Sequence, residues 1–200
     1  SASDSKVYDG KPLTNNNVTV GGEDGFVKGE GATFNVTGSQ TNVGSSSNTF
    51  TFELNEGTLE QNYDIETHEG TLAVTADENE VVVTITEHSD TVKYDGTEHT
   101  VKGYDVNISN PLYTENDFTF SGNDEIKGKN ADKYEMNLTA DDFENINSNF
   151  EKVTFKIVDG SLVIEKREVE LISANVSKVY DGTPLTNDTV TVSKDGFAEG

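Results

Sequence analysis

The chain has 200 residues, of which 37 are Asp or Glu and 14 are Lys or Arg, so its net charge is −23 at neutral pH. A chain this acidic has no basic stripe, which excludes nucleic acid and an anionic membrane surface as partners. Cys is absent, so neither disulfides nor thiolate metal sites stabilise the fold. No apolar run is long enough to insert into a membrane, and we expect any export signal or wall anchor to lie outside this fragment.

A Tyr-Asp-Gly tripeptide recurs along the chain at a constant interval. Each of its Tyr residues is followed by the next after 86 residues, which indicates a tandem repeat. Asp-Gly predicts a turn with positive φ at Gly, and the preceding Tyr is an aromatic anchor that we expect to be largely buried, as at Tyr94. The residues of this structural motif are Tyr8, Asp9, Gly10, Tyr94, Asp95, Gly96, Tyr180, Asp181 and Gly182.

The interval predicts three repeats, covering 1–76, 77–165 and 166–200. The second repeat opens on Val81–Thr86, whose apolar residues alternate as in a half-buried strand. Glu168–Ile172 is the matching strand of the third repeat. We expect the third repeat to be only the truncated start of a unit, and the first repeat to lack this opening strand. For 166–200 two outcomes are open: a segment that packs beside the second repeat or protrudes as a hairpin, or a strand that fills the first repeat of another chain.

Shorter alternating runs predict further strands inside the repeats. Val18–Val20 matches Val190–Val192, and both follow the Tyr-Asp-Gly turn. Phe50–Leu54 matches Tyr134–Leu138 at an offset of 84 residues. Each run has one apolar and one polar face, which is typical of strands that cover a core on one side.

The end of the second repeat adds a predicted hairpin and one short helical turn. Val153–Ile157 and Leu162–Ile164 flank Asp159-Gly160, a sequence typical of a hairpin turn. Thr139–Glu144 has an N-cap residue followed by acids, as at the start of a helix. With about seven strands per complete repeat, the pattern predicts an all-β fold of tandem antiparallel β-sandwich (Ig-like) modules in an extended array. The alternative is β-grasp-like modules with one short helix.

No set of residues amounts to a catalytic or cofactor site, and we predict that the chain is not an enzyme. His68, His88 and His99 lack the spacing of metal ligands. Oxygen donors gather at Asn123–Glu125 and Asp141–Glu144, but neither run follows the twelve-residue calcium-loop pattern. We therefore expect no metal and no cofactor, and we interpret the acidic surface as a solvated one.

A Lys–Asn isopeptide crosslink is a further covalent option. It requires a buried Lys beside an Asn and a carboxylate, and Lys6, Lys93 and Lys178 recur near the start of the repeats. Lys93 is displaced by one position relative to the other two, so in a strand its side chain faces the opposite side. This displacement argues against the crosslink.

Several runs of the chain carry a family resemblance. Lys178–Asn187 (Lys-Val-Tyr-Asp-Gly-Thr-Pro-Leu-Thr-Asn), Gly25–Gly31 and Gly70–Thr75, with Asn110–Gly122 and Asp159–Ile164 in the second repeat, resemble the YDG/MBG-type tandem repeats. Such repeats occur in large, adhesin-like bacterial cell-surface proteins, mostly Gram-positive and gut-associated. The resemblance implies an extracellular place on the bacterial surface, with wall anchoring through regions outside this fragment, and it supplies no catalytic residues.

Two functions follow from this resemblance. The first is a stalk or spacer that projects an adhesive or functional tip, with neighbouring repeats of the same chain as partners. The second is an adhesion module that itself binds host glycan or mucin. Repetition favours the spacer, because repeated units with variable loops need only stack and stay soluble.

Overall fold

The computed structural model describes residues 1–22 and 24–199, and the described residues form an all-β chain. The expected β fold class is therefore confirmed. Helical structure is limited to the three-residue 3₁₀ turns η1 (Glu60–Asn62), η2 (Glu115–Asp117) and η3 (Ala140–Asp142). The predicted helical turn is η3, closed by a capping box between Thr139 and Asp142. None of the described helices is long and apolar enough to cross a membrane.

The strands are short, and their order along the chain is as follows. They are β1 (Asp4–Val7), β2 (Ala32–Val36), β3 (Gly44–Asn48), β4 (Phe50–Leu54), β5 (Gly70–Thr75), β6 (Val81–Glu87), β7 (Asp90–Lys93), β8 (His99–Lys102), β9 (Tyr104–Ile108), β10 (Phe118–Phe120), β11 (Glu125–Gly128), β12 (Lys133–Glu135), β13 (Phe143–Asn145), β14 (Val153–Val158), β15 (Ser161–Glu165), β16 (Val169–Ser173) and β17 (Val190–Lys194).

The chain divides into two compact units. Unit 1 comprises Ser1–Val83, Ile108–Thr119 and Glu144–Thr154, and unit 2 comprises Thr84–Asn107, Phe120–Phe143 and Phe155–Gly200. Each unit thus combines residues from two of the predicted repeats. The contact of Tyr8 in the first repeat with Phe150 in the second lies inside unit 1, and that of Arg167 in the third repeat with Tyr94 in the second lies inside unit 2.

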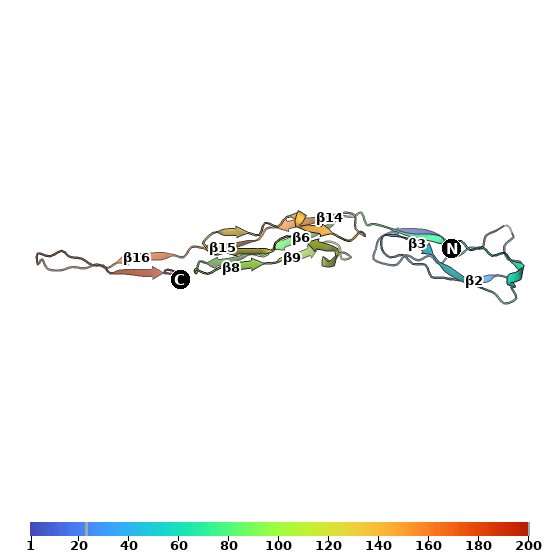
Figure 1. Ribbon diagram of the computed structural model, residues 1–200, viewed down its shortest axis with the longest axis horizontal. Coiled ribbons are helices and arrows are strands. Elements are labelled where there is room, and N and C mark those ends of the chain that lie inside the picture. Colours follow the sequence, from blue (N-terminus) through green and yellow to red (C-terminus); the bar gives the residue numbers. More distant parts are fainter. Residues whose placement is uncertain (23, 200) are drawn as a thin grey trace. The chain divides into compact units, whose positions relative to one another are not determined.

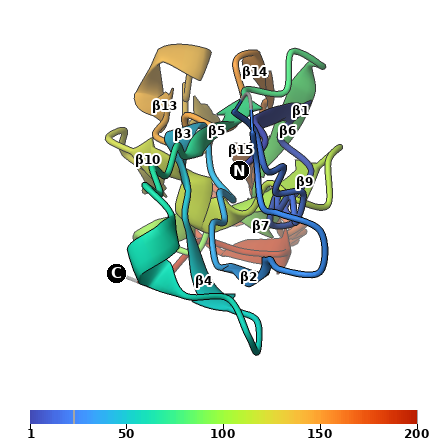
Figure 2. The same ribbon diagram turned by 90° about the vertical axis from the view of Figure 1, so that its right-hand side faces the viewer.

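In unit 1 the first repeat has a three-stranded sheet in the order β1-β5-β3 and a separate β2-β4 pair. β3 and β5 lie side by side (Figure 2), with Ser46 opposite Leu72. Leu72 and Val74, on the inner face of β5, are buried with Leu13, and Tyr8 packs against this cluster. This small cluster is the core of the first repeat.

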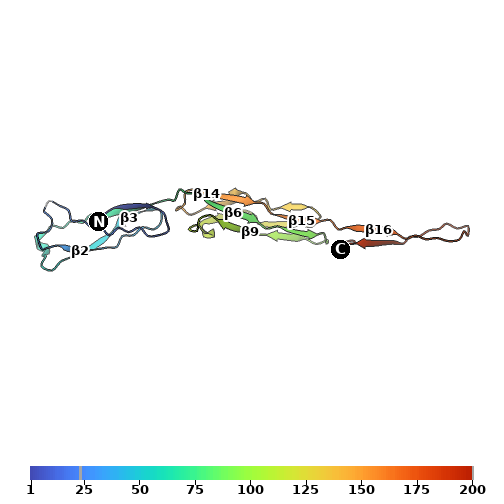
Figure 3. The ribbon, with the colours of Figure 1, turned by 180° about the vertical axis from the view of Figure 1, so that it is seen from behind.

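The second repeat has the larger core. β6 lies between β14 and β9 (Figures 1 and 3), and its alternate residues Val81, Val83 and Ile85 are all fully buried. The period of two read from the sequence is thus the burial period of this strand. A second sheet has the order β12-β15-β7, with Leu162 of β15 fully buried.

The prediction of purely antiparallel sheets is wrong, because each of the first two repeats contains a parallel strand pair. β1 pairs parallel to β5, with Asp4 opposite Leu72, and β7 pairs parallel to β15 in the same way, with Asp90 opposite Leu162. A tight hairpin makes its strands antiparallel, whereas strands this far apart along the chain can pair in either direction. Alternation along a strand shows its faces but not the direction of its partner.

The predicted hairpin around Asp159-Gly160 is also wrong. β14 pairs in the sheet of β6, while β15 pairs with β12 and β7, so this link passes the chain from one sheet to another. The link is tightly packed, since a Cβ on Gly160 would clash with the backbone oxygen of His88. Asp-Gly marks the turn, but not whether the strands that it joins pair with each other.

The match between Phe50–Leu54 and Tyr134–Leu138 fails in the structure. β12 pairs with β15 as β3 pairs with β5, so the counterpart of β12 is β3 rather than β4. β12 ends before Asn137, which has a φ of +62°. Two runs with similar apolar alternation therefore need not be equivalent strands, because alternation does not show which strand each run pairs with.

Residues 166–199 form a two-stranded antiparallel hairpin of β16 and β17, which Figure 1 shows extending from β15. This corresponds to the hairpin alternative for this segment. Val190–Val192 lies in β17 as predicted, but Val18–Val20 is not in a strand. The reason is the partner: β16 hydrogen-bonds to β17, and no described strand pairs with Val18–Val20.

Candidate functional site: the Tyr-Asp-Gly turns

Each Tyr-Asp-Gly turn of the first two repeats begins where a parallel strand pair ends. The N–H of Tyr8 donates to the carbonyl oxygen of Thr75 at 2.8 Å, and the N–H of Tyr94 donates to that of Glu165 at the same distance. These bonds continue the β1–β5 and β7–β15 ladders by one residue. The backbone of the two tyrosines is therefore held in the same way.

The Asp of each turn closes it through its own side chain. Its carboxylate accepts a hydrogen bond from the backbone N–H two residues later, an arrangement that mimics a backbone turn. Positive φ at Gly, predicted for Gly96, is confirmed at 85°, and the other two turns have the same conformation. The bonds are Asp9 to Lys11 at 2.9 Å, Asp95 to Thr97 at 2.8 Å and Asp181 to Thr183 at 2.9 Å.

These bonds stabilise the ionised Asp and lower its pKa. In Asp95 the hydroxyl and N–H of Thr97, with the His99 ring, lower the pKa to about 2. In Asp181 the ammonium of Lys178 and the donors of Thr183 also lower the pKa to about 2. Each turn is thus held by hydrogen bonds to its own Asp carboxylate, whether or not another part of the chain packs against it.

The turn of the first repeat packs against the second repeat within unit 1. The rings of Tyr8 and Phe150 meet edge to face with centroids 5.5 Å apart, and Phe150 is only 2% exposed. A Cβ placed on Gly10 would lie 3.0 Å from Cδ2 of Leu112, so the turn lies directly on this side chain. Edge-to-face aromatic pairs add to the stabilisation that burial provides.

A chain of Asn side chains supports this junction. The Oδ1 of Asn145 accepts from the N–H of Asn147 at 3.0 Å, and the Oδ1 of Asn147 accepts from the N–H of Asn149 at 2.9 Å. Asn149 then reaches the first repeat: its Oδ1 accepts from the N–H of Val43 at 2.8 Å, and its Nδ2 donates to Asn42 at 3.2 Å. The alternate Asn residues thus shape the loop that the first repeat contacts.

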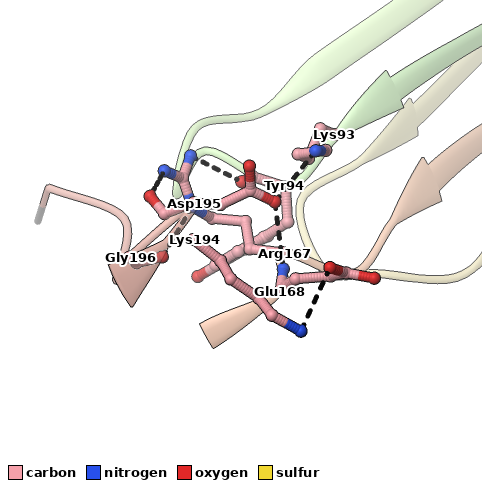
Figure 4. A network of polar contacts seen from close by, with 7 residues as sticks. All are labelled: Lys93, Tyr94, Arg167, Glu168, Lys194, Asp195 and Gly196. Atoms are coloured by element: carbon pink, nitrogen blue, oxygen red, sulfur yellow. Dashed lines mark hydrogen bonds and ion pairs between the residues drawn. The ribbon is translucent and has the colours of Figure 1, made fainter. Parts of the chain in front are cut away.

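The turn of the second repeat contacts the third repeat within unit 2 (Figure 4). The guanidinium of Arg167 donates to the carbonyl oxygens of Gly196 at 3.0 Å and of Tyr94 at 3.4 Å, and also to that of Asp195. The Lys93 ammonium donates to the Asp195 carboxylate at 2.8 Å. This ion pair raises the pKa of Lys93 and lowers that of Asp195.

The two junctions have the same spacing along the chain. A Cβ on Gly96 would lie 3.6 Å from Cβ of Ala198, and 102 residues separate these two positions, as they separate Gly10 from Leu112. Tyr94 lines a groove of about 280 Å³ with residues of the third repeat that include Val169 and Phe197. Tyr94 is partly buried there, at the side of this open groove.

The third turn has no such contact among the described residues. Tyr180 is 92% exposed, and a Cβ on Gly182 would meet nothing within 4 Å. The same tripeptide therefore occurs in two packed states and one open state.

The histidines do not come together. His68 faces Glu66, the Nε2 of His99 donates to the Asp95 carboxylate in the second turn, and His88 lies 3.1 Å from Asp105. Hydrogen bonds to Asp105 and to the carbonyl oxygen of Lys102 raise the pKa of His88.

The predicted oxygen clusters and lysines have local roles. Asp142 caps η3, and Glu125 pairs with Lys127. No cluster of three or more possible metal-ligating side chains is found in the part of the chain that the structure describes. Lys6 and Lys178 pair with the Asp of their own turns, whereas Lys93, displaced by one position, pairs across to Asp195.

Sequence reasoning missed two polar residues that hold the fold. Arg167, at the boundary of the second and third repeats, is the only Arg of the chain, and that rarity was the available signal. Glu87 is buried, and its carboxylate accepts from the N–H of Leu138 at 2.9 Å and of Gly160 at 2.7 Å. In the first repeat Ser1, 86 positions earlier, accepts from the N–H of Gly70 at 3.0 Å in the same place.

Comparison with known families agrees with this organisation over the second repeat. No curated protein and no solved structure matches the chain significantly. The MBG domain family matches residues 80–166, from the start of β6 to the end of the strand that pairs with β7. This match supports an MBG/YDG-type repeat at these residues.

Proposed function

We propose that the chain is a non-enzymatic spacer of a bacterial surface protein, whose repeats project an adhesive or functional tip from the cell. The MBG match supports a repeat module of a surface-type protein. The observation that carries the spacer role is the repeated junction: the turns at Gly10 and Gly96 contact the following repeat at the same spacing.

A spacer holds its tip at a defined distance only if each repeat restrains the orientation of the next. The first junction combines the Tyr8–Phe150 ring pair with the two hydrogen bonds that Asn149 makes to Val43 and Asn42. The second combines the Arg167 contacts with the Lys93–Asp195 ion pair. Aromatic contact and directional hydrogen bonds together limit rotation about the short link between repeats. The high negative charge keeps such a surface soluble and discourages side-by-side association.

The sandwich arrangement belongs to the same proposal. In the second repeat the β14-β6-β9 and β12-β15-β7 sheets are joined by short links at Glu87–Asp90 and Val158–Ser161. Links that pass the chain between two sheets are typical of Ig-like sandwiches. Each complete repeat is accordingly proposed as one such module in a tandem array.

Direct adhesion to glycan or mucin is the second candidate function. Tyr8, Asn42, Asn116 and Asp117 line a shallow groove of about 450 Å³ in unit 1, and an aromatic ring among amides and carboxylates suits a sugar. Against this, several of these polar atoms already bind one another, as Asn147 does to Asp117 at 2.8 Å. The spacer therefore remains the stronger proposal.

Spin labels at the exposed positions Thr51 and Glu115 test the spacer role, since the chain has no native Cys to interfere. These residues belong to the first and second repeats and lie in unit 1. We expect a narrow distance distribution that broadens in Tyr8→Ala, with Tyr180→Ala as the unaffected control. A broad distribution in the unmodified sequence contradicts a restraining junction.

Binding to immobilised mucin distinguishes direct adhesion from the spacer role. The spacer proposal expects no retention of the chain above that of an Asn42→Ala variant. Saturable retention that Asn42→Ala and Tyr8→Ala both abolish, with the narrow spin-label distribution intact in Asn42→Ala, favours direct adhesion instead.

A further inference from the structure

Three backbone links of the second repeat meet at one corner of unit 2. His88 lies in the link from β6 to β7, Gly103 forms the link from β8 to β9, and Gly160 lies in the link from β14 to β15. The N–H of His88 donates to the carbonyl oxygen of Gly103 at 3.1 Å, and a Cβ on Gly160 would clash with the carbonyl oxygen of His88. Each link passes the chain from one sheet to another, so this corner holds several sheets together.

The His88 ring lies between two oxygen acceptors at this corner. Its Nδ1 is 2.8 Å from the carbonyl oxygen of Lys102 in β8, and its Nε2 is 3.1 Å from Oδ1 of Asp105 in β9. A Cβ on Gly103, which has a φ of +89°, would lie 3.3 Å from Nδ1, so the ring rests directly on this glycine. A neutral imidazole has one N–H and can donate to only one of the two oxygens, whereas an imidazolium donates to both. The position of the ring therefore suits its charged form.

The other two repeats form the same backbone bond without a histidine. The N–H of Ala2 donates to the carbonyl oxygen of Asn17 at 2.9 Å, and the N–H of Ala174 donates to that of Thr189 at 3.1 Å. Ala2, His88 and Ala174 follow one another at 86 residues. The backbone of this corner is thus common to the repeats, and the histidine ring is an addition of the second repeat.

Asn amides support the corner in the first and third repeats. The Oδ1 of Asn15 accepts from the N–H of Asn17, and the Oδ1 of Asn187 accepts from the N–H of Thr189, both at 3.0 Å. An amide does not ionise, whereas a histidine changes its charge near neutral pH. We propose that His88 is a pH-sensitive brace of the second repeat: charged, it bonds β8 and β9 together across Gly103, and on losing its proton it releases one of them and the corner loosens.

The surroundings of the ring are mostly acidic. The charged residues on the elements that meet at this corner are Glu87, Asp90, Lys102, Asp105, Asp124 and Asp159. Glu87 is already bonded to the N–H groups of Leu138 and Gly160, and Asp105 is the carboxylate that contacts the ring. The bond to Asp105, with that to the carbonyl oxygen of Lys102, raises the pKa of His88 above its ordinary value.

The direction of the pH effect follows from this shift. The folded pKa of His88 lies above the unfolded value of about 6.5. The contribution of the brace to stability is therefore complete below about pH 6.5 and is lost as pH rises through the folded pKa. Asp95 has the opposite sign, because its folded pKa lies below the unfolded one.

Amide exchange from about pH 5.5 to about pH 8.5 tests the brace, because the N–H of His88 bonds across the corner to Gly103. After division by the intrinsic exchange rate at each pH, we expect the protection of this N–H to fall as the ring loses its proton. Ring NMR is expected to give a His88 midpoint above about 6.5, with both ring nitrogens protonated below it.

Three variants separate the brace from other causes. His88→Gln keeps a polar side chain that does not titrate, so the pH-dependent loss of protection is expected to vanish. His68→Gln is the matched control, because the His68 side chain is 87% exposed and lies in unit 1, and it is expected to leave that loss unchanged. Asp105→Asn keeps an acceptor but removes its charge, and it is expected to lower the His88 midpoint.

Two results overturn the inference: a His88 midpoint at or below about 6.5, or a pH-dependent loss of protection that persists in His88→Gln. An unchanged midpoint in Asp105→Asn would also contradict it, since the carboxylate would then not hold the ring. The spin-label test measures the junction between the first and second repeats, so the brace and the spacer role can fail independently.

Discussion

The same tripeptide, Val-Thr-Val, stands in the first and third repeats and has two structures. Val190–Val192 lies in β17 and pairs antiparallel with β16, with Leu171 opposite Val192. Val18–Val20 lies outside the strands. Identical local propensity therefore gives a strand only where a neighbouring strand supplies the hydrogen bonds, because backbone groups must find partners.

The opening strands of the second and third repeats show the same lesson for burial. Ile85 of β6 is fully buried, whereas Leu171 of β16, 86 residues later, is 60% exposed. Both strands alternate apolar and polar residues. What differs is the pairing: among the described strands, β6 pairs with β14 and β9 on its two edges, while β16 pairs with β17 alone.

The largest expected effect tests this difference in burial. Ile85→Ala removes a fully buried side chain and should destabilise the second repeat by about 4 kcal/mol. Leu171→Ala, at the matching exposed position, should change stability by less than about 0.5 kcal/mol. Urea unfolding followed by circular dichroism measures both changes. Similar losses in the two variants would show that β16 is covered in solution.

Glu87 is the next expected effect. Glu87→Ala leaves the N–H groups of Leu138 and Gly160 without an acceptor in a buried place, which should cost about 3 kcal/mol. Glu80→Ala is the matched control, because Glu80 is exposed and should contribute less than about 0.5 kcal/mol. Urea unfolding measures both changes. Equal losses of stability in the two variants would show that the hydrogen bonds of Glu87 to Leu138 and Gly160 do not stabilise the fold.

Packed and open turns give a smaller contrast. Tyr8→Ala removes a half-buried ring from Phe150 and should destabilise unit 1 by about 2 kcal/mol, below the loss for a fully buried aromatic. Tyr180→Ala should change stability by less than about 0.5 kcal/mol, since its ring is exposed. Hydrogen exchange of β5 amides reports the difference. No change in exchange on Tyr8→Ala would exclude the junction as a source of stability.

The smallest expected effect is the loss of stability at acid pH that the turn carboxylates cause. The folded pKa of Asp95 is about 2, below the unfolded value of about 3.9, so its contribution to stability is present above pH 4 and is lost as pH falls toward 2. The same sign holds for Asp181, because its turn is closed without packing. Carboxyl NMR titration should show both midpoints near 2, and Thr97→Val should raise that of Asp95 alone. An ordinary midpoint for Asp181 would mean that packing, not the turn itself, lowers the pKa.

Local chemistry made part of this protein predictable. The interval of Tyr-Asp-Gly, the positive φ at Gly96, the alternation of β6 and the cap of η3 depend on neighbouring residues, so the sequence alone predicts them. The same interval also showed that the turn is a repeated feature of the chain.

Tertiary structure decided which strands pair and what each turn contacts. The parallel β1–β5 and β7–β15 pairs, the passage between sheets at Gly160 and the failure of Val18–Val20 to form a strand all depend on partners far along the chain. Alternation shows which face of a strand is apolar but not what covers it. The contact of Tyr8 with Phe150 joins residues 142 positions apart, and only the fold brings these rings together.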